Sequence, residues 1–294
     1  MAVRRDPLRP RLRAAVPILA IALLTCLVVA PVASANFLTP ESGGSPNANA
    51  IGSLYKIVLY IAAVVFVIVE GALVYSLFKF RASKGAVAAQ IHGNTRLEIG
   101  WTLAAALILV VLTVVTFIKL PSIVNPPNSD AAGLALSASL TQPTPPNGKK
   151  LSVCVQGRQY IWRYTYGNGC KDGGFKQPYS YQEMVVPVHT TVVLTIQASD
   201  VIHSWWVPAM GGKVDAVPGY TTYTWFKPLH TGDFRGQCAQ LCGMNHAAMT
   251  AIIHVVTPAQ YQAWVTAQAQ KLSAASAQVR TLRRILTSQN ALGN

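Results

Sequence analysis

The residues best suited to chemistry lie in one short segment near the C-terminal end of the chain. Two thiols, an imidazole and a thioether, those of Cys238, Cys242, His246 and Met249, fall within twelve positions, and His203 stands thirty-five residues earlier. Thiolates together with a thioether form a soft ligand set that suits copper better than zinc. Two alternatives to copper remain, a Cys238–Cys242 disulfide and a structural zinc site, and in both Met249 is only a core residue.

Two stretches around these residues fit a family pattern. They read GQCAQLCGMNHAAM over residues 236–249 and HSWWVP over residues 203–208. Together they strongly resemble subunit II of cytochrome c oxidase, whose pattern is Cys-x-Glu-x-Cys-Gly-x-x-His-x-x-Met preceded by His-Ser-Trp-x-Val-Pro. The resemblance covers essentially the whole chain after the first 35 residues. It implies a dinuclear copper centre, CuA, with two copper ions in a cupredoxin-like domain.

The resemblance also implies the copper ligands. The thiolates of Cys238 and Cys242 would bridge both coppers. His203 and Met249 would complete one copper. His246 and the backbone carbonyl of Gln240 would complete the other. Gln240 departs from the family pattern, which has Glu at this position. Because a neutral amide is a poor ligand for a hard cation, we expect the family's Mg or Mn site at the contact with subunit I to be weakened.

Three further residues are candidates by the same resemblance. In GRQYIW, residues 157–162, Tyr160 stands where the family has the surface Trp that admits the electron. Trp162, one strand period further on, is the alternative, and Tyr160 as a plain packing residue is another. Glu98 matches a carboxylate at the cytoplasmic entrance of a proton path in subunit I. An acid at the membrane interface beside the aromatic anchor Trp101 is the structural alternative.

Composition indicates a membrane protein. Hydrophobic residues make up 51% of the 294 residues and charged residues only 12%, about half of what a soluble domain contains. A soluble globular protein and a disordered chain are therefore both disfavoured. The net charge of +14 would suit a nucleic-acid binder, but basic flanks of membrane spans produce the same excess, and we expect no nucleic acid as a partner.

The N-terminal part predicts a signal peptide followed by a transmembrane hairpin. Residues 1–35 have a basic start, an apolar middle and a small-x-small end, as secretory signals do. Residues 36–120 contain two apolar spans, at about 57–77 and 99–118, each close to the 20 residues that cross a bilayer. Basic residues lie between the spans and are missing from residues 36–55. By the positive-inside rule the C-terminal half lies outside the bacterial inner membrane.

The rest of the chain predicts an α+β membrane protein with an all-β domain. Residues 121–150 contain six prolines and form a linker. Residues 151–257 contain runs rich in β-branched and aromatic residues, which we expect to be strands of a cupredoxin-like domain: Leu151–Tyr166, Val185–Ala198, Thr221–Phe226 and Met249–Val256. Residues 258–294 change to a helical pattern, with Thr257 as the N-cap and Pro258 at the first position.

A second cysteine pair, Cys154 and Cys170, leaves two outcomes open. Export favours a disulfide. A straight strand from Cys154 to Tyr166, however, would span about 40 Å, whereas the Cα atoms of bridged cysteines lie within about 7 Å. Only a strong bend, near Gly157, reconciles the two.

The resemblance implies a specific function. The chain would accept electrons outside the membrane from cytochrome c or a cupredoxin and pass them to haem in oxidase subunit I. Oxygen would be reduced there, in a complex that also pumps protons and includes subunit III. The chain would thus be a subunit of an oxidoreductase without the oxygen-reducing site itself. The alternative is a binding module, a membrane-anchored copper carrier or sensor.

Charge on the outer half indicates what kind of donor fits. Residues 121–294 contain 13 Lys and Arg but only six acids, a net charge of +7. A domain so poor in carboxylates repels a basic donor, so we expect a neutral or acidic donor, or an acidic exterior. The alternative is that the positive charge lies away from the docking face, in the basic C-terminal helix with Arg280, Arg283 and Arg284.

Overall fold

The structure is a computed structural model that describes residues 38–81, 85, 90, 92–129, 147–167, 170 and 177–292. The signal peptide expected over residues 1–35 lies outside the described residues, as does most of the expected linker. Residues 41–294 form one compact unit, and residues 1–40 form another, described only at its last three positions.

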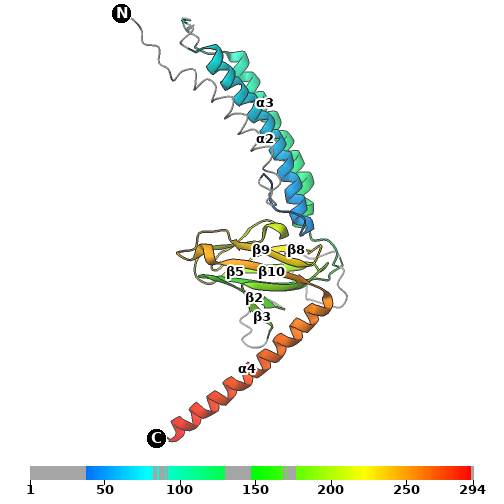
Figure 1. Ribbon diagram of the computed structural model, residues 1–294, viewed down its shortest axis with the longest axis vertical. Coiled ribbons are helices and arrows are strands. Elements are labelled where there is room, and N and C mark those ends of the chain that lie inside the picture. The colour runs from blue at the N-terminus through cyan, green and yellow to red at the C-terminus, as the bar shows by residue number, and fades with distance from the viewer. Residues whose placement is uncertain are drawn as a thin grey trace, which may run out of the picture. The chain divides into compact units, whose positions relative to one another are not determined.

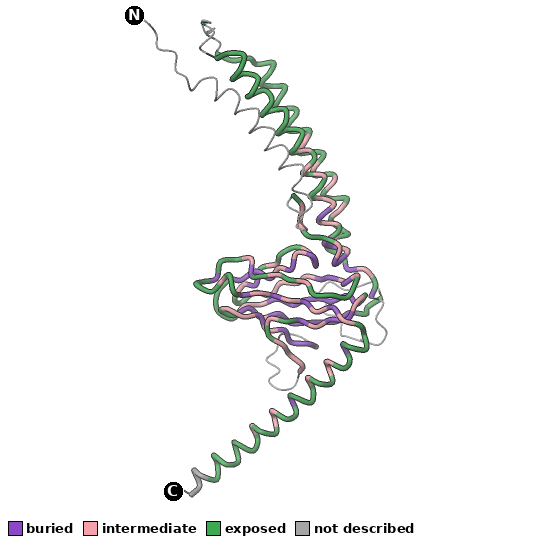
Figure 2. The backbone as a smooth tube through the Cα atoms, viewed as in Figure 1, coloured by how far each residue is buried: buried purple, intermediate pink, exposed green. Residues whose placement is uncertain are grey.

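Two long apolar helices precede the β-domain. They are α2 (Pro46–Lys79) and α3 (Thr95–Val124), which pack against each other and are long and apolar enough to cross a membrane. Their residues are largely exposed (Figure 2), and many of the exposed side chains are apolar, as in helices that face lipid. α3 continues past Pro121, so the first residues of the expected linker are helical. A proline lacks only its own N–H donor, and the N–H of Asn125 still donates to the Pro121 carbonyl.

The β-domain is a sandwich of two five-stranded sheets (Figure 1). The first sheet has the order β3 (Tyr179–Tyr181), β2 (Ile161–Tyr166), β1 (Leu151–Arg158), β5 (Val192–Ala198) and β8 (Thr222–Phe226). The second has the order β4 (Glu183–Pro187), β10 (Thr250–Val256), β9 (Gly232–Cys238), β6 (His203–Trp206) and β7 (Val214–Ala216). Two pairs are parallel, β1 with β5 and β4 with β10. The expected fold class, an apolar helix pair followed by a cupredoxin-like domain and a C-terminal helix, is confirmed.

Two of the expected strands are wrong because each is divided by a turn. The run expected over Leu151–Tyr166 forms a hairpin of β1 and β2, with Gln159 and Tyr160 between the strands. The run expected over Val185–Ala198 divides into β4 and β5, which belong to different sheets. The dividing segment follows Pro187, and His189 there has a φ of 58°. Both runs are rich in β-branched residues on either side of the turn, so composition alone does not mark the break.

The hairpin explains the second cysteine pair. β2 returns antiparallel to β1 and places Thr165 opposite Cys154, so the chain beyond β2 lies close to Cys154 again. Cys154 and Cys170 form a disulfide with a Cα–Cα distance of 5.1 Å. The bend that a disulfide requires is therefore present, at Gln159 and Tyr160 rather than at Gly157.

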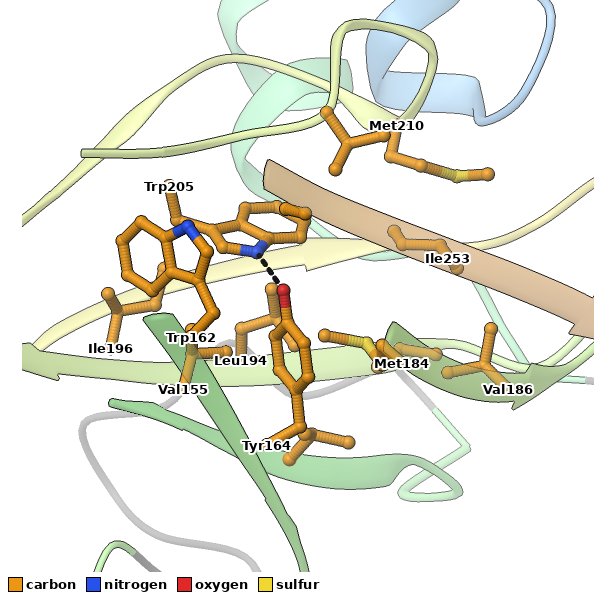
Figure 3. Packing of buried hydrophobic residues seen from close by; sticks show 14 of the residues in the cluster. Val155, Trp162, Tyr164, Met184, Val186, Leu194, Ile196, Trp205, Met210 and Ile253 are labelled. Atoms are coloured by element: carbon orange, nitrogen blue, oxygen red, sulfur yellow. Dashed lines mark hydrogen bonds between the residues drawn. The ribbon is translucent and has the colours of Figure 1, made fainter. Parts of the chain in front are cut away.

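The core lies between the two sheets. Strand β10 alternates between buried and half-buried side chains, so Ala251, Ile253 and Val255 face inward. Figure 3 shows Trp162 and Tyr164 of the first sheet packing among side chains of the second. The Trp205 indole N–H donates to the Tyr164 hydroxyl at 3.3 Å, which satisfies two polar groups that would otherwise be unpaired in the core.

Strand β8 is bonded to both apolar helices. The Trp225 indole N–H donates to the carbonyl of Val124, the last residue of α3, at 2.8 Å. The Asn47 amide, in the first turn of α2, donates to the Trp225 carbonyl at 2.7 Å. One tryptophan therefore ties the two helices to the edge of the sandwich.

The last element is α4 (Pro258–Leu292), which contacts β4. Its N-terminus is capped as the sequence predicts, because the Gln260 N–H donates to the Thr257 hydroxyl at 3.3 Å. Near this start, Tyr261 and Trp264 pack against Tyr166 of β2. Only the N-terminal part of α4 thus joins the domain core.

Candidate metal centre

The predicted ligand residues come together at one end of the second sheet. His203 begins β6, Cys238 ends β9 and Met249 immediately precedes β10. Cys242 and His246 lie in the loop between β9 and β10. Since β9 lies between β10 and β6 in the sheet, the three strand ends bring residues distant in sequence to one place.

The Cys238 thiol has three potential ligands around it. Its Sγ lies 3.9 Å from His203 Nδ1, 4.0 Å from Cys242 Sγ and 3.2 Å from the Gln240 carbonyl oxygen. The ligand atoms of His203, Cys238 and Cys242 all lie within 4.8 Å of one another, and all three residues are buried. Gln240 is exposed, and the part of it near the thiol is its backbone carbonyl.

The Cys242 thiol lies near the other two predicted ligand residues. Its Sγ lies 3.6 Å from His246 Nδ1 and 3.9 Å from Met249 Sδ. Met249 is completely buried, whereas His246 is partly exposed. All six residues predicted as ligands are therefore gathered around the two sulfur atoms.

The two thiols are free and are not a disulfide. Their sulfur atoms are 4.0 Å apart, about twice the length of an S–S bond. Burial and the neighbouring Cys238 raise the pKa of Cys242 to about 11, so without a metal the thiol is protonated at neutral pH. A soft cation favours the thiolate form and would displace this proton.

His203 is oriented by a carboxylate. Its Nε2 lies 2.9 Å from Asp200 Oδ1, so Nδ1 is the nitrogen that faces the thiols. Burial works against ionisation of Asp200, but hydrogen bonds from the Gln159 N–H, His203 and the Val201 N–H lower its pKa overall. A carboxylate on the far nitrogen of a ligand histidine fixes the ring and increases its basicity.

Gln159 joins the carboxylate to the thiol loop. Its backbone N–H donates to Asp200 Oδ2 at 2.7 Å, and its side-chain amide donates to the Cys242 carbonyl, also at 2.7 Å. Sequence reasoning missed both Gln159 and the orienting role of Asp200. The Asp-x-x-His spacing of Asp200 and His203 was the available signal, whereas nothing local in the sequence marks Gln159.

Tyr160 and Trp162 occupy different environments and do not share a strand face. Tyr160 lies in the β1–β2 turn, half-buried, and its hydroxyl accepts a hydrogen bond from the Met244 N–H at 3.0 Å. Only glycine fits at position 243, since φ is +135° there and a Cβ would lie 2.5 Å from the Tyr160 hydroxyl. Trp162 is completely buried, and its ring centroid lies 5.8 Å from that of His203.

Glu98 is remote from these residues in the sequence and has a local role in its helix. Its Oε1 accepts a hydrogen bond from the Asn94 N–H at 3.3 Å, while the Asn94 side chain accepts one from the Leu97 N–H at 3.2 Å. This reciprocal pair caps the N-terminus of α3. A capping role does not occupy the second carboxylate oxygen.

Two family descriptions match the chain in its two parts. "Cytochrome C oxidase subunit II, transmembrane domain" matches residues 33–118, and "Cytochrome C oxidase subunit II, periplasmic domain" matches residues 169–256. Among curated relatives, cytochrome c oxidase subunit 2 of Cereibacter sphaeroides is 31% identical over 77% of this chain and 80% of its own length. The chain belongs to the cytochrome c oxidase subunit II family.

Other similar proteins carry the same family name. Cytochrome c oxidase subunit 2 of Alkalihalophilus pseudofirmus is 33% identical over 78% of this chain, but the match spans only 61% of that longer relative. The crystal structure of the periplasmic domain of subunit II of cytochrome oxidase of Bradyrhizobium japonicum is 34% identical, with a TM-score of 0.38, and covers 42% of this chain and 96% of its own. The expected identification as a subunit II chain, with a transmembrane part and a periplasmic domain, is confirmed.

Proposed function

We propose that this subunit II chain binds a dinuclear copper centre, receives electrons from a donor outside the bacterial inner membrane and passes them to haem in oxidase subunit I. The observation that carries the proposal is the convergence of the four other predicted ligand residues on the two buried thiols of Cys238 and Cys242. Copper is what the family and the soft ligand set imply. When bound, such a centre takes up and releases one electron at a time.

The thioether favours copper over zinc. His203, Cys238, Cys242 and His246 alone would suit a structural zinc ion. Met249 has no place in such a set, yet its sulfur is completely buried at 3.9 Å from Cys242 Sγ. A thioether is a weak ligand that tunes copper rather than holding it. We expect Met249→Leu to retain copper and shift its reduction potential, and no shift would count against ligation.

The chain's own residues would keep this site rigid and dry. Asp200 holds the His203 ring, and Gln159 holds both Asp200 and the backbone at Cys242. Burial of both thiols and of Met249 excludes water from one side of the site. A ligand shell that does not rearrange between oxidation states minimises the reorganisation that accompanies electron transfer.

Tyr160 is the better candidate for the residue where the electron enters. It lies in a turn, half-buried, and bonds directly to the loop that carries the thiols, whereas Trp162 is enclosed in the core. Trp162 is more suited to packing against the His203 ring. The loop beside Tyr160 exposes Leu241 by 78% and Met244 by 96%. These apolar tips support docking of a donor with a neutral face.

The remaining assignments, those of Gln240 and Glu98, concern the contact with subunit I. The exposed Gln240 amide would provide no carboxylate for Mg or Mn between the subunits. Glu98, with one oxygen free of the cap bond, would serve the cytoplasmic entrance of a proton path in subunit I. Subunit III would complete the complex. Manganese supplied during growth should leave little bound Mn, and a stoichiometric signal lost in Gln240→Ala would contradict the expectation for Gln240.

Copper loading of the full-length chain tests the central proposal. The mixed-valence protein should be purple, contain two coppers per chain and show a seven-line paramagnetic spectrum. A four-line spectrum, or one zinc per chain, would exclude the dinuclear centre. A copper carrier or sensor would instead bind one exchangeable copper that a chelator removes readily, so chelator resistance separates the two functions.

Donor charge is tested separately. Reduction of the copper centre by a basic and by an acidic cytochrome is followed across a salt series. With the net charge of +7 on the outer half, the acidic donor should be faster at low salt and should slow as salt rises. A basic donor that is faster at low salt would mean that the docking face is acidic.

A further inference from the structure

Helix α4 carries a mostly apolar row that continues beyond the domain. Its positions follow one another at alternating steps of four and three residues, and all but one of them are apolar. We call them the α4 seam: Tyr261, Val265, Gln268, Leu272, Ala275, Val279, Leu282 and Leu286. A 3.5-residue repeat over more than three heptads is the pattern of a coiled coil, in which a single polar seam residue serves to fix the register. The polar position, Gln268, lies in the half nearer the domain, so the distal half of the seam is uninterrupted.

Exposure along the α4 seam increases toward its C-terminal end, from buried Tyr261 and Leu272 through half-buried Val279 to exposed Leu282 and Leu286. Tyr261 is 6% exposed within the core cluster, and Leu272 is 9% exposed. Beyond them Leu282 is 59% and Leu286 is 60% exposed, and Ile285 beside them is also exposed. Most of the distal part of α4 is exposed (Figure 2). A single exposed leucine is ordinary, but a continued seam is the sign of a missing partner.

Charge restricts what that partner is. Residues 258–294 contain no Asp or Glu, whereas α4 carries Lys271, Arg280, Arg283 and Arg284. Lys271 and Arg283 stand next to seam residues, at the flanking positions whose charges select partners in coiled coils. Arg284 lies on the opposite side of the helix. A second copy of this chain would add a second basic helix with no acid to match it.

The place where α4 joins the sandwich makes a membrane surface a less suitable partner for the α4 seam. α4 contacts β4, and β4 packs beside β3 at one edge of the sandwich. The apolar helices bond to β8 at the other edge, where β7 lies beside it. Four strand intervals separate the two edges, about 19 Å. The α4 seam also follows the narrow two-position stripe of a coiled coil rather than the wider apolar stripe of an amphipathic surface helix.

We infer that the distal half of α4, residues 275–288, is a docking helix for an acidic amphipathic helix of another protein. The partner helix pairs its own apolar seam with Val279, Leu282 and Leu286. Its carboxylates flank that seam and face Arg283. This surface is independent of the copper site.

The test uses the full-length chain in neutral detergent and a labelled synthetic peptide of about three heptads. The peptide has Leu at both seam positions and Glu at the flanking positions, and a second peptide has Lys in place of Glu. Fluorescence anisotropy should show binding of the Glu peptide and at least tenfold weaker binding of the Lys peptide. In Leu282→Ser/Leu286→Ser, the affinity for the Glu peptide should fall about 100-fold, with helix content unchanged by circular dichroism.

Adjacent arginines supply a matched control. Arg283→Glu, beside the seam, should weaken the Glu peptide about fivefold, whereas Arg284→Glu changes net charge equally and should have less than about half that effect. Equal effects of the two variants, or equal binding of the two peptides, would overturn the proposal. So would dimerisation of the chain through this helix. Binding to phosphatidylglycerol vesicles without binding of the Glu peptide would assign the helix to lipid instead.

Discussion

The two cysteine pairs of the β-domain differ in their bonding, since one is a disulfide and the other is free. Cys154 and Cys170, sixteen residues apart, form a disulfide with a Cα–Cα distance of 5.1 Å. Cys238 and Cys242, only four residues apart, remain free, with their sulfur atoms at 4.0 Å. Both pairs lie in the same exported domain, so the compartment does not explain the difference.

The surroundings of each pair explain it. The first pair is brought together by a hairpin, and the sulfur of Cys154 is enclosed by core strands. The free pair lies among potential metal ligands, in a loop held by hydrogen bonds from Gln159 and to Tyr160. A covalent bond fixes one pair, whereas the other pair stays free in a loop that hydrogen bonds attach to the β1–β2 turn.

The largest effect is expected from removing one of the free thiols. Cys242→Ser replaces a thiol that the proposed copper centre requires by a poor ligand for soft metals. Copper affinity should fall by about 100-fold or more, by comparison with structural zinc sites, where four ligands share a binding free energy of about 10–16 kcal/mol. Copper titration of the full-length chain under a competing chelator measures this loss. The double variant Cys154→Ala/Cys170→Ala is the control and should bind copper normally.

The same double variant should lose stability instead of copper. Removing a cross-link around a loop of sixteen residues costs about 3 kcal/mol in free energy of unfolding. Urea unfolding followed by tryptophan fluorescence provides the measurement, with Cys242→Ser as the comparison. A double variant that keeps its stability but loses its copper spectrum would reverse the roles assigned to the two pairs.

Sequence reasoning predicted which side chains gather at the two thiols but not the framework that orders them. The motif from Cys238 to Met249 is local, so its spacing alone indicates a metal site. The Cys154–Cys170 disulfide depended on whether residues 151–166 bend, and β-branched residues on both sides of Gln159 hid the turn. Gln159 itself acts on residues 41 and 83 positions away, Asp200 and Cys242. Contacts of that kind exist only once the two sheets are assembled.

A moderate effect is expected from weakening the network around the free pair. Gln159→Ala removes the amide that bonds to the Cys242 carbonyl but retains the backbone N–H that bonds to Asp200. Outer partners of metal ligands typically contribute about tenfold or more to affinity, so copper binding should weaken by about tenfold. Arg158→Ala, an exposed neighbour, is the matched control. If the two variants bind copper with equal affinity, Gln159 has no positioning role.

The smallest effect is expected at Tyr160, where removing the hydroxyl tests its hydrogen bond to the thiol loop separately from the aromatic ring. Tyr160→Phe keeps the aromatic ring but removes the acceptor of the Met244 N–H. Because Met244 is 96% exposed, water can replace the lost partner, and the free energy of unfolding should fall by less than about 1 kcal/mol. Electron transfer from the donor should stay close to that of the unmodified chain, whereas Tyr160→Leu, without the ring, should slow it. Stopped-flow reduction measures the transfer rate, and urea unfolding measures stability. If Tyr160→Phe slows transfer as much as Tyr160→Leu, the hydroxyl and its bond to the thiol loop matter more than the ring.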